Sequence, residues 1–267
     1  MIKVGILGAN GRMGRVLIDA VYQHAELGLA FTSVRTGSAF IGLDAGELAG
    51  INKQYITVKE LTPELADFAD VLIDFTLPDA LEGNLEYAIV HKKPIIIGTT
   101  GLDDAQLALI DDAAKKVPIV LAANYSIGVN LMLNLVKTTA KVMGDRADIE
   151  ILEAHHRFKK DAPSGTAIAI GQSIAETLNR DLDKVAVFGR EGDTGERDSQ
   201  TIGFATVRAG DIVGEHTALF ATLGERIEIT HKASSRLTFA NGALTAAIWV
   251  KEKPFGLYSM QDVLALT

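Results

Sequence analysis

The first half of the chain alternates short apolar runs with longer amphipathic ones, and this alternation restricts the fold more than any other feature. The apolar runs, each of strand length, are Lys3–Leu7, Leu27–Val34, Val71–Phe75, Pro94–Gly98 and Ile119–Ala123. The helix-like runs between and after them are Met13–His24, Asp79–His91, Asp103–Lys116 and Val129–Met143. Nearly continuous apolar strands that alternate with helices are typical of a parallel sheet covered on both faces. The sequence therefore predicts a doubly wound α/β domain.

The pattern changes after about Asp145. Ala147–Ala154 is strand-like and Ser164–Leu178 is helix-like, and three further strand-like runs follow at Thr201–Arg208, Ile212–Thr222 and Arg226–His231. Short turns join these last three runs, which favours antiparallel pairing between them. The polar segment Asp181–Gln200 has the composition of a mobile loop. We therefore expect a second, α+β domain with a mixed or antiparallel sheet.

Composition excludes several classes of function. The 267 residues include 26 Lys and Arg against 34 Asp and Glu, which gives a formal net charge of −8. Such a surface does not attract nucleic acid or an anionic membrane. The chain has no cysteine, so disulfides, thiolate zinc sites and cysteine nucleophiles are excluded. Neither a signal-peptide pattern nor an apolar run of about 20 residues is found, and we expect a cytoplasmic protein without nucleic-acid or membrane partners.

A glycine-rich turn joins the first expected strand to the first expected helix. It reads Gly8, Ala9, Asn10, Gly11, Arg12, Met13 and Gly14. Asn10 stands at the second glycine of the usual G-x-G-x-x-G dinucleotide fingerprint, so the spacing is G-x-x-G-x-x-G. Glycines allow the backbone to turn sharply beside a pyrophosphate, and the helix N-terminus offers it free amides. A tight turn alone would also use glycine, but the position between strand and helix favours dinucleotide binding.

The end of the second strand bears on the choice of cofactor. An acidic residue there would hold the ribose hydroxyls of NAD, but Val34, Arg35 and Thr36 follow one another with no acid among them. Arg35 suits a 2′-phosphate, which favours NADPH over NADH, although a solvated loop residue would look the same. Two further turns follow expected parallel strands and are placed to contact a nucleotide, although ordinary strand-to-helix turns would look similar: Gly98, Thr99 and Thr100, and Ala122, Ala123, Asn124 and Tyr125.

A cluster of basic and titratable residues in an acidic chain is the second functional signal. It spans Glu153–Ala167, EAHHRFKKDAPSGTA. Adjacent histidines point to opposite sides of a strand, so His155 and His156 do not share a metal ion easily. The lysines beside them would repel a cation, and no metal site is expected.

Anion binding suits this cluster better. Asp161 to Thr166 has the composition of a helix start, with a capping-type residue, a proline suited to the first turn and small residues. Free amides there, the hydroxyls of Ser164 and Thr166, and the charge of Lys159 would together bind a dicarboxylate. A capped helix after a solvated basic turn is the alternative interpretation. A reduced substrate also needs a proton, for which His155, His156 and Lys159 are candidates. For either histidine, the alternative is a core residue whose ring is satisfied by hydrogen bonds.

The same residues resemble the signature of a known family. The pattern Glu150-x-x-Glu153-x-His155-x-x-x-Lys159-x-Asp161-x-Pro163-Ser164-Gly165-Thr166-Ala167 is similar to that of the 4-hydroxy-tetrahydrodipicolinate reductases, formerly called dihydrodipicolinate reductases. The resemblance extends to GANGRMG, VLIDFT, GTTG, AANYSIGVN, TIGFATVRAGDIVGEHT and ITHKASSRLTFANGA, and so covers nearly the whole chain.

The resemblance implies a fold and a reaction. The fold would comprise a Rossmann-type dinucleotide-binding domain (1–126), a substrate-binding and tetramerisation domain (127–235), and a C-terminal segment (236–267) that returns to the first domain. The reaction would be the NAD(P)H-dependent reduction of a cyclic imine dicarboxylate with loss of water, in diaminopimelate and lysine biosynthesis. A homotetramer is also implied.

The resemblance also implies roles for individual residues. His155 would donate the proton, with Lys159 sharing that role and binding substrate, and His156, Gly165 and Thr166 would bind substrate. Cofactor contacts would fall on Gly8–Met13, Arg35, Gly98–Thr100 and Ala122–Tyr125. Val34 departs from the family pattern, in which an acid often stands at this position, so NADPH is the expected cofactor and NADH a possible one.

Two other functions compete with the reductase. One is a different nicotinamide-dependent dehydrogenase of an amino acid, such as the aspartate or homoserine type. The other is a non-enzymatic dinucleotide sensor, which would have no use for His155, Lys159 and a carboxylate site together.

Overall fold

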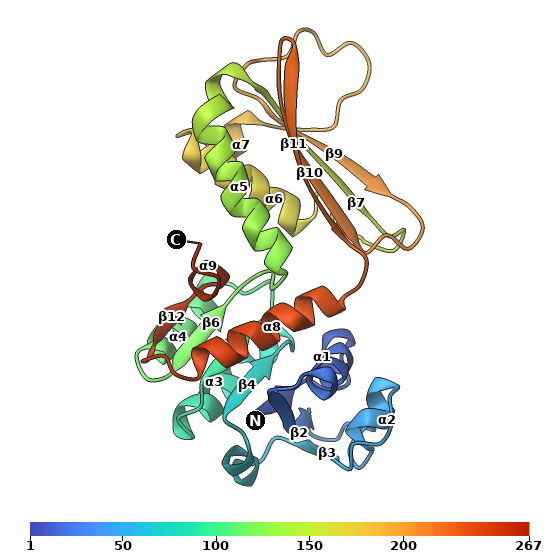
Figure 1. Ribbon diagram of the computed structural model, residues 1–267, viewed down its shortest axis with the longest axis vertical. Coiled ribbons are helices and arrows are strands. Elements are labelled where there is room, and N and C mark those ends of the chain that lie inside the picture. The colour runs from blue at the N-terminus through green and yellow to red at the C-terminus, as the bar shows by residue number, and fades with distance from the viewer. Residues whose placement is uncertain (267) are drawn as a thin grey trace. The chain divides into compact units, whose positions relative to one another are not determined.

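The computed structural model describes residues 1–266, and the chain forms two compact units (Figure 1). The first comprises Met1–Ile127 and the chain from Arg236 onward, and the second comprises Gly128–Ser235. Within residues 1–266, no helix has the length and apolar character needed to cross a membrane.

The first unit is built on a seven-stranded parallel sheet (Figure 1). Its order is β12-β6-β5-β4-β1-β2-β3, and its strands are β1 (Ile2–Leu7), β2 (Leu27–Val34), β3 (Val58–Glu60), β4 (Val71–Asp74), β5 (Ile95–Ile97), β6 (Pro118–Leu121) and β12 (Gly256–Tyr258). Strand β1 pairs with both β2 and β4, so the direction of winding reverses between β1 and β4. In a doubly wound sheet, ligands bind beside the carboxyl ends of the strands at this reversal.

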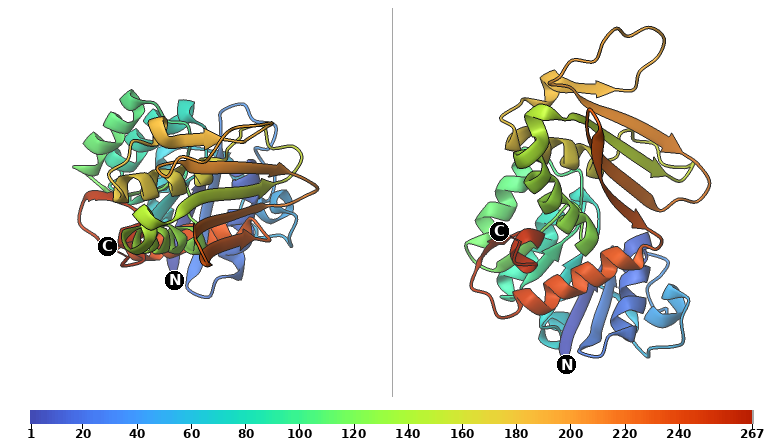
Figure 2. Two further views of the ribbon diagram at one scale, coloured as in Figure 1. Left: turned by 90° about the horizontal axis from the view of Figure 1, so that it is seen from above. Right: turned by 45° about the horizontal axis from the view of Figure 1, so that its top comes forward.

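Helices cover both faces of this sheet (Figure 2). They are α1 (Arg12–Gln23), α2 (Ala45–Ala49), α3 (Leu81–Val90), α4 (Asp104–Ala114), α8 (Leu237–Val250) and α9 (Met260–Val263), with short 3₁₀ turns at Pro63–Phe68 and Pro78–Ala80. Successive strand residues point to opposite faces. Accordingly, Val4 and Ile6 pack with α1 and α8, whereas Leu7 packs with α3 and α4. Both faces being apolar explains the continuous apolar runs of the sequence and confirms the predicted α/β class.

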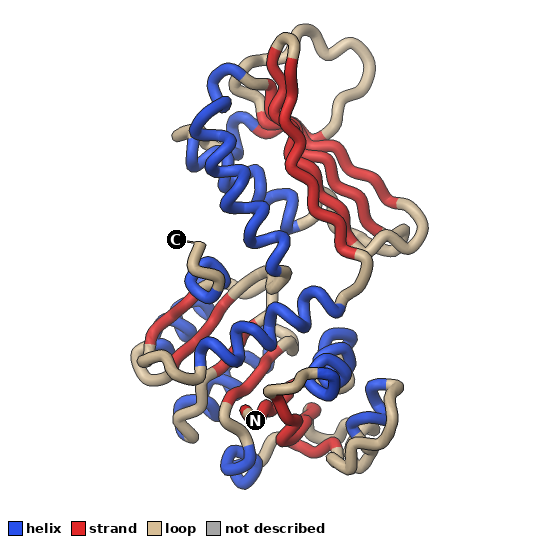
Figure 3. Tube along the Cα trace, viewed as in Figure 1, coloured by secondary structure: helices blue, strands red, loops and turns tan. Residues whose placement is uncertain are grey.

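The second unit packs helices against one face of a five-stranded mixed sheet (Figure 3). The order is β11-β10-β7-β9-β8, with strands β7 (Asp148–His155), β8 (Ala186–Phe188), β9 (Ile202–Arg208), β10 (Gly214–Thr222) and β11 (Glu225–Ala233). The helices are α5 (Ile127–Met143), α6 (Gly165–Thr177) and α7 (Leu182–Val185), with a 3₁₀ turn at Gly144–Arg146. Ile149 and Ile151 of β7 are buried among residues of these helices. The predicted α+β domain with a mixed sheet is confirmed.

One predicted strand pairing is wrong. The short turn after Arg208 led us to expect that β9 and β10 pair as an antiparallel hairpin, but β7 lies between them. Strand β9 pairs with β7 in parallel and β10 pairs with β7 antiparallel. The expected hairpin pairing occurs only between β10 and β11. In the centre of the sheet, the backbone of β7 forms hydrogen bonds with β9 on one side and with β10 on the other. A direct pairing of β9 with β10 would leave β7 without these partners.

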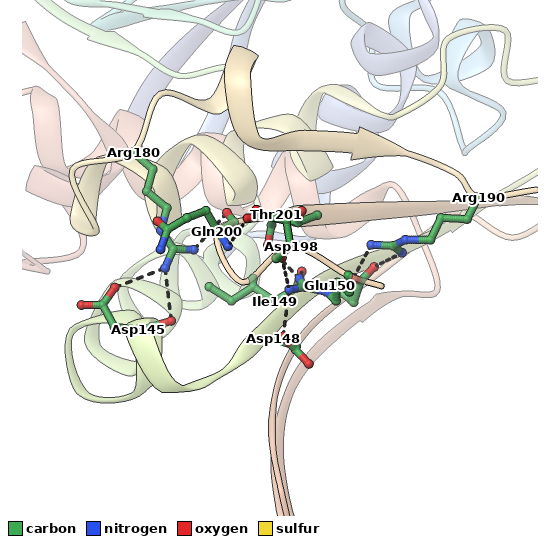
Figure 4. Close-up of polar contacts among 11 residues, drawn as sticks. Asp145, Asp148, Ile149, Glu150, Arg180, Arg190, Asp198, Gln200 and Thr201 are labelled. Atoms are coloured by element: carbon green, nitrogen blue, oxygen red, sulfur yellow. Dashed lines mark hydrogen bonds and ion pairs between the residues drawn. The ribbon is translucent and has the colours of Figure 1, made fainter. Parts of the chain in front are cut away.

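The segment Asp181–Gln200 is also more structured than predicted. It contains α7 and β8, and the rest is tied to β7 by arginines. Arg190 donates to both carboxylate oxygens of Glu150, at 3.0 and 2.9 Å (Figure 4). Arg197 donates to Glu150, to Asp148 and to the carbonyl oxygens of Ile149 and Thr201. Its glycines and charged residues suggested a mobile loop, but two of the charged residues, Arg190 and Arg197, form ion pairs with β7.

Candidate functional site

The carboxyl edge of the first sheet carries the residues expected to bind a cofactor. Strands β1, β2, β5 and β6 end at this edge, and the turns that follow them contain Gly8–Met13, Arg35, Gly98–Thr100 and Ala122–Tyr125, respectively. These turns are far apart in sequence and come to one edge because all four strands are parallel. The glycine turn follows β1, one of the two strands at the reversal of winding.

The glycine turn holds α1 close to the end of β1. Gly8 has φ +78°, a backbone conformation that side chains disfavour. A Cβ at Gly14 would lie 2.3 Å from the carbonyl oxygen of Gly8 and 2.8 Å from the carbonyl carbon of Ala9. Glycine is therefore required at position 14 because the first turn of the helix touches the backbone of the strand end.

The amides of this turn divide into two groups. Those of Gly8 and Ala9 both donate to the carbonyl oxygen of Ser33, at 2.9 Å, and so fasten the turn to β2. Helix α1 begins after Gly11, which has no side chain to cap it. Whereas the amide of Arg15 donates to the carbonyl oxygen of Gly11 at 3.1 Å, those of Arg12, Met13 and Gly14 in the first turn of the helix lack intrahelical acceptors. These later amides fit a pyrophosphate, whereas Gly8 and Ala9 serve mainly to shape the turn.

The end of β2 has a neighbour that sequence analysis missed. Strand β2 ends at Val34, and Arg35 is exposed beyond it. Glu60, at the end of β3, pairs in register with Val34. Its carboxylate accepts from the amide of Gly37 at 3.1 Å and from the hydroxyl of Thr36 at 3.3 Å. An acid thus stands at this edge after all, and it shapes the loop that carries Arg35.

A buried aspartate organises the turns that follow β4 and β5. Asp74, at the end of β4, is fully buried. It accepts from the amide and hydroxyl of Thr76 at 2.8 and 2.6 Å, from Asn84 at 2.9 Å and from Thr99 at 3.4 Å. Thr99 is buried as well, while Thr100 is exposed. Of these two, only Thr100 offers an exposed side chain.

Tyr125 stabilises the strand ends by its side chain. It is buried, and its hydroxyl lies 2.9 Å from the carbonyl oxygen of Ile97 and 2.8 Å from that of Val120. Burial raises the pKa of this phenol well above its usual range. The exposed residue of this turn is Ala123, so a nucleotide would meet the backbone here and not the phenol.

In the second unit, His155 lies at the end of β7 within a polar cluster. Its Nδ1 lies 2.5 Å from the carboxylate of Glu153, and its ring lies 5.1 Å from that of His216, edge to face. Burial lowers the pKa of His155, the hydrogen bond and charge of Glu153 oppose that effect, and the net shift is downward. Lys159 is half-buried and pairs with Asp161 at 2.9 Å. Its charge also reaches His155.

Two residues of this cluster received no role from the sequence. Arg208 forms two hydrogen bonds with Glu153, at 2.8 and 2.9 Å. His216 is buried, and burial is the main cause that lowers its pKa to about 4, so it is neutral near pH 7. Both residues come from strands far along the chain and meet β7 only through the sheet. Glu153, in contrast, is two residues from His155 on a strand, and that spacing predicts a shared face.

The start of α6 differs from the expectation. We expected Asp161 to cap the helix with Pro163 in its first turn, but the cap is Ser164, whose hydroxyl accepts from the amide of Ala167 at 3.2 Å. The Asp161 carboxylate is instead held by Lys159. The Ser164 hydroxyl also bonds Nε2 of His216 at 2.9 Å. It is therefore engaged twice within the protein, and the residues at the helix start itself are Gly165 and Thr166.

His156 has a different aromatic neighbour from His155. Its side chain is half-buried, and its ring lies 6.3 Å from that of Phe158. Among residues 1–266, no three His, Asp or Glu side chains gather in a way that could hold a metal ion.

The parallel sheet, the reversal of winding and the glycine turn define a dinucleotide-binding protein of the Rossmann type, whose second unit contains a buried cluster of titratable residues. The family model for "Dihydrodipicolinate reductase, N-terminus" matches residues 2–125, and that for "Dihydrodipicolinate reductase, C-terminus" matches residues 128–264. The chain belongs to the dihydrodipicolinate reductase family.

Individual relatives agree with this assignment. A 4-hydroxy-tetrahydrodipicolinate reductase of Pseudoalteromonas atlantica is 64% identical over 268 residues, which cover 100% of both chains. One of Colwellia psychrerythraea is 60% identical over 265 residues, which cover 99% of this chain and 98% of the relative.

Solved structures share the fold. A dipicolinate-bound dihydrodipicolinate reductase of Paenisporosarcina sp. TG-14 matches with a TM-score of 0.77 and 25% identity, over 98% of both chains. A DAP dehydrogenase of C. glutamicum in complex with DAP matches with a TM-score of 0.57 and 13% identity, over 100% of this chain and 95% of the other. At that identity the second likeness concerns the fold alone.

Proposed function

We propose that this protein catalyses the NAD(P)H-dependent reduction of 4-hydroxy-tetrahydrodipicolinate to tetrahydrodipicolinate, with loss of water, in diaminopimelate and lysine biosynthesis. The observation that carries this proposal is the full-length identity of 64% to a reductase of that name. The buried cluster around His155 supports it, because it supplies a proton donor and cationic groups for a dicarboxylate. A cytoplasmic location is part of the same proposal, since the reaction serves amino-acid biosynthesis.

The cluster accounts for the proton chemistry as follows. When bound, the nicotinamide cofactor supplies a hydride to the substrate. His155 then delivers a proton through Nε2, because Nδ1 is engaged by Glu153. Lys159 binds the substrate and shares in the proton transfer, with its charge balanced by Asp161. The backbone of Gly165 and Thr166 at the start of α6, together with His156, binds a substrate carboxylate. Ser164 contributes by capping that helix.

Turnover is the direct test. The purified protein should oxidise NADPH when the substrate is formed in situ from pyruvate and aspartate semialdehyde by the preceding condensation reaction. His155→Gln and Lys159→Ala should each lose most of kcat while cofactor affinity stays near that of the wild type. A collapse of cofactor affinity in these variants would place both residues in the nucleotide site instead. Cofactor binding without turnover of this substrate would favour the sensor or another dehydrogenase.

We also propose that the protein prefers NADPH over NADH. Arg35 is exposed at the end of β2, where the adenosine ribose is held in this fold. Glu60 is engaged by Thr36 and Gly37, and so it shapes the loop around Arg35. Arg35→Ala should weaken NADPH binding by about 1.5–3 kcal/mol, roughly ten- to a hundredfold, and leave NADH binding nearly unchanged. Lys59→Ala, which removes an exposed charge on the neighbouring strand, is the control. Equal losses for both cofactors would refute this role of Arg35.

A homotetramer formed through the second unit completes the proposal. The face of its sheet opposite α5 and α6 exposes apolar side chains, including Leu152 (44% exposed) and Val207 (52% exposed). Charged residues at this face should disrupt assembly. Sedimentation of Leu152→Lys should therefore show a smaller particle than the wild type, whereas Val142→Lys, on α5, should not. An unchanged mass for Leu152→Lys would contradict assembly through this face.

A further inference from the structure

We infer that Glu153 is a positioning residue for His155: its carboxylate fixes the imidazole so that Nε2 is the nitrogen that exchanges a proton, and Gly214 keeps the space beside that nitrogen open. This inference rests on the proposed function in one respect, namely that His155 transfers the proton. The orientation and tautomer of the ring can be tested without turnover.

The carboxylate of Glu153 is itself held from several directions. Its side chain is 1% exposed and accepts from Nδ1 of His155, both terminal nitrogens of Arg208, the hydroxyl of Thr206 and the amide of Ser164. These donors come from β7, from β9 and from the cap of α6. So many hydrogen bonds fix the orientation of the carboxylate, and the carboxylate in turn fixes the orientation of the His155 ring.

The ionisation of Glu153 determines which nitrogen of His155 carries hydrogen. Burial would raise the pKa of Glu153, but hydrogen bonds and charges from Arg208 and His155 outweigh it and lower the pKa. An ionised carboxylate only accepts hydrogen bonds, so Nδ1 of His155 must carry a hydrogen in both protonation states. The proton that comes and goes is therefore the one on Nε2.

Gly214, the first residue of β10, lies beside that nitrogen. A Cβ at this position would stand 3.1 Å from Nε2 of His155 and 3.4 Å from Cδ2. The φ of Gly214 lies outside the left-handed region, so its backbone conformation does not call for glycine. What distinguishes glycine here is the absence of a side chain next to Nε2, which leaves room for a substrate atom.

The same carboxylate links the proton donor to the substrate-binding helix. Its bond from the Ser164 amide is 3.2 Å long, and Gly165 and Thr166 follow directly. One buried group thus fixes both His155 and the start of α6. A change at Glu153 should alter the chemistry more than the affinity for substrate, because the substrate-binding backbone of α6 is also capped independently by Ser164.

A matched pair of variants separates positioning from stability. Glu153→Gln removes the charge while keeping the shape, and Glu150→Gln does the same to a carboxylate on the other face of β7 that is paired with Arg190 and Arg197. We expect Glu153→Gln to lower kcat about ten- to a hundredfold with a smaller change in KM. Glu150→Gln should leave kcat and its pH profile at wild-type values. Equal effects of the two variants on kcat would overturn the inference.

The pH profile gives a second readout. The charged and titratable groups around His155 are Glu153 on β7, Lys159 and Asp161 in the following loop, Arg208 on β9, His216 on β10 and, beyond it, His231 on β11. Of these, Glu153 favours protonation of His155. In Glu153→Gln the loss of kcat at rising pH should therefore begin at a lower pH than in the wild type. A purely structural role would leave this limb in place.

Nuclear magnetic resonance of the labelled imidazole nitrogens tests the tautomer directly. The chain has six histidines, and His155→Asn identifies the signals of His155. Neutral His155 should carry its hydrogen on Nδ1 in the wild type and in Glu150→Gln, and should shift toward Nε2–H in Glu153→Gln. Wild-type signals for a hydrogen on Nε2 would refute the inference. If the wild type showed the expected tautomer but no reductase activity, the proposed reaction would fail and the positioning of His155 would stand.

Gly214→Ala keeps the inference testable if Glu153→Gln does not fold. The added methyl group should lower kcat by up to about a hundredfold by occupying the space beside Nε2, while His155 retains its hydrogen on Nδ1. Full activity of Gly214→Ala would show that the reacting nitrogen is not the one beside Gly214.

Discussion

Replacing Gly14 by alanine tests whether the cofactor turn depends on contact between α1 and the end of β1. The new Cβ would lie 2.3 Å from the carbonyl oxygen of Gly8 and 2.8 Å from two backbone atoms of Ala9. A normal separation is about 3.5–4 Å, and backbone atoms cannot rotate away as a flexible side chain can. The first turn of α1 must therefore move away from the strand end by about 1 Å.

Two opposing contributions set the size of the effect. Alanine favours a helix by about 1 kcal/mol relative to glycine. Overpacking that forces a backbone shift costs about 1–3 kcal/mol, and occasionally more. We therefore expect a net loss of up to about 2 kcal/mol in the stability of the first unit. The displaced helix start should also weaken NADPH binding at least tenfold. At a concentration of 100 times the wild-type Kd, NADPH stabilises the wild type by about 2.7 kcal/mol and would stabilise such a variant by only about 1.4 kcal/mol.

Urea unfolding followed by tryptophan fluorescence measures both effects. The chain has one tryptophan, Trp249, in α8 of the first unit, so the signal reports on that unit. Gly83→Ala in α3 is the control, because a Cβ there meets nothing within 4 Å. It should be as stable as the wild type or up to about 1 kcal/mol more stable. If Gly14→Ala unfolded at the same urea concentration as Gly83→Ala, with the same stabilisation by NADPH, the contact between turn and helix would not constrain position 14.

Three further predictions concern single side chains. Tyr125→Phe should cost the first unit about 1–2 kcal/mol in the same urea titration, because the hydroxyl bridges carbonyl oxygens of β5 and β6, whereas Tyr258→Phe, which loses one exposed bond, should cost little. Arg197→Ala should speed proteolytic cleavage between residues 189 and 200, whereas Arg226→Ala, which breaks an exposed pair, should not. His216→Gln should make the free energy of unfolding depend less on pH between 6.5 and 4. The pKa of His216 is about 4 in the folded state against an ordinary 6.5. Its contribution to the free energy of unfolding is therefore complete above pH 6.5 and falls by about 3 kcal/mol toward pH 4. An unchanged slope of stability against pH would contradict this.

Much of the first unit could be predicted because its sheet is buried on both faces. Each strand then reads as a continuous apolar run, and the ranges expected for β1 and β2 differ from the observed ones by at most one residue. Helix α8 was not predicted, because it too is largely buried. Its sequence, LTFANGALTAAIWV, is apolar throughout, so it shows no amphipathic period.

The second unit was predictable in its elements but not in its pairing. A short turn between two strand-like runs normally signals a hairpin, and it does so for β10 and β11. The turn between β9 and β10 connects two strands that lie on either side of β7. Strand β7 precedes β9 by some 50 residues in the chain. Local sequence contains no information about a strand that inserts from elsewhere. The order of the strands therefore had to come from the structure.

The candidate site shows the same division between local and distant signals. His155, Lys159 and Ser164 lie in one short segment, and their residue types alone suggest acid–base chemistry and a helix start. Glu153 could have been added, because two residues along a strand return to the same face. Arg208 and His216 could not, since their contacts with Glu153 and Ser164 depend on the register of β9 and β10 against β7.

Contacts with residues far away in the sequence determine the protonation states of the residues in the motif. Without Arg208, Glu153 would be a buried carboxylate whose ionisation burial opposes, and it could then donate to His155 instead of accepting from it. The bidentate bond from Arg208 keeps Glu153 ionised. If Glu153 positions His155 as we infer, a residue 55 positions further along the chain determines which nitrogen of His155 holds the exchangeable proton. For this reason the motif suggests His155 as the acid–base residue, and only the sheet that surrounds His155 determines how it is protonated.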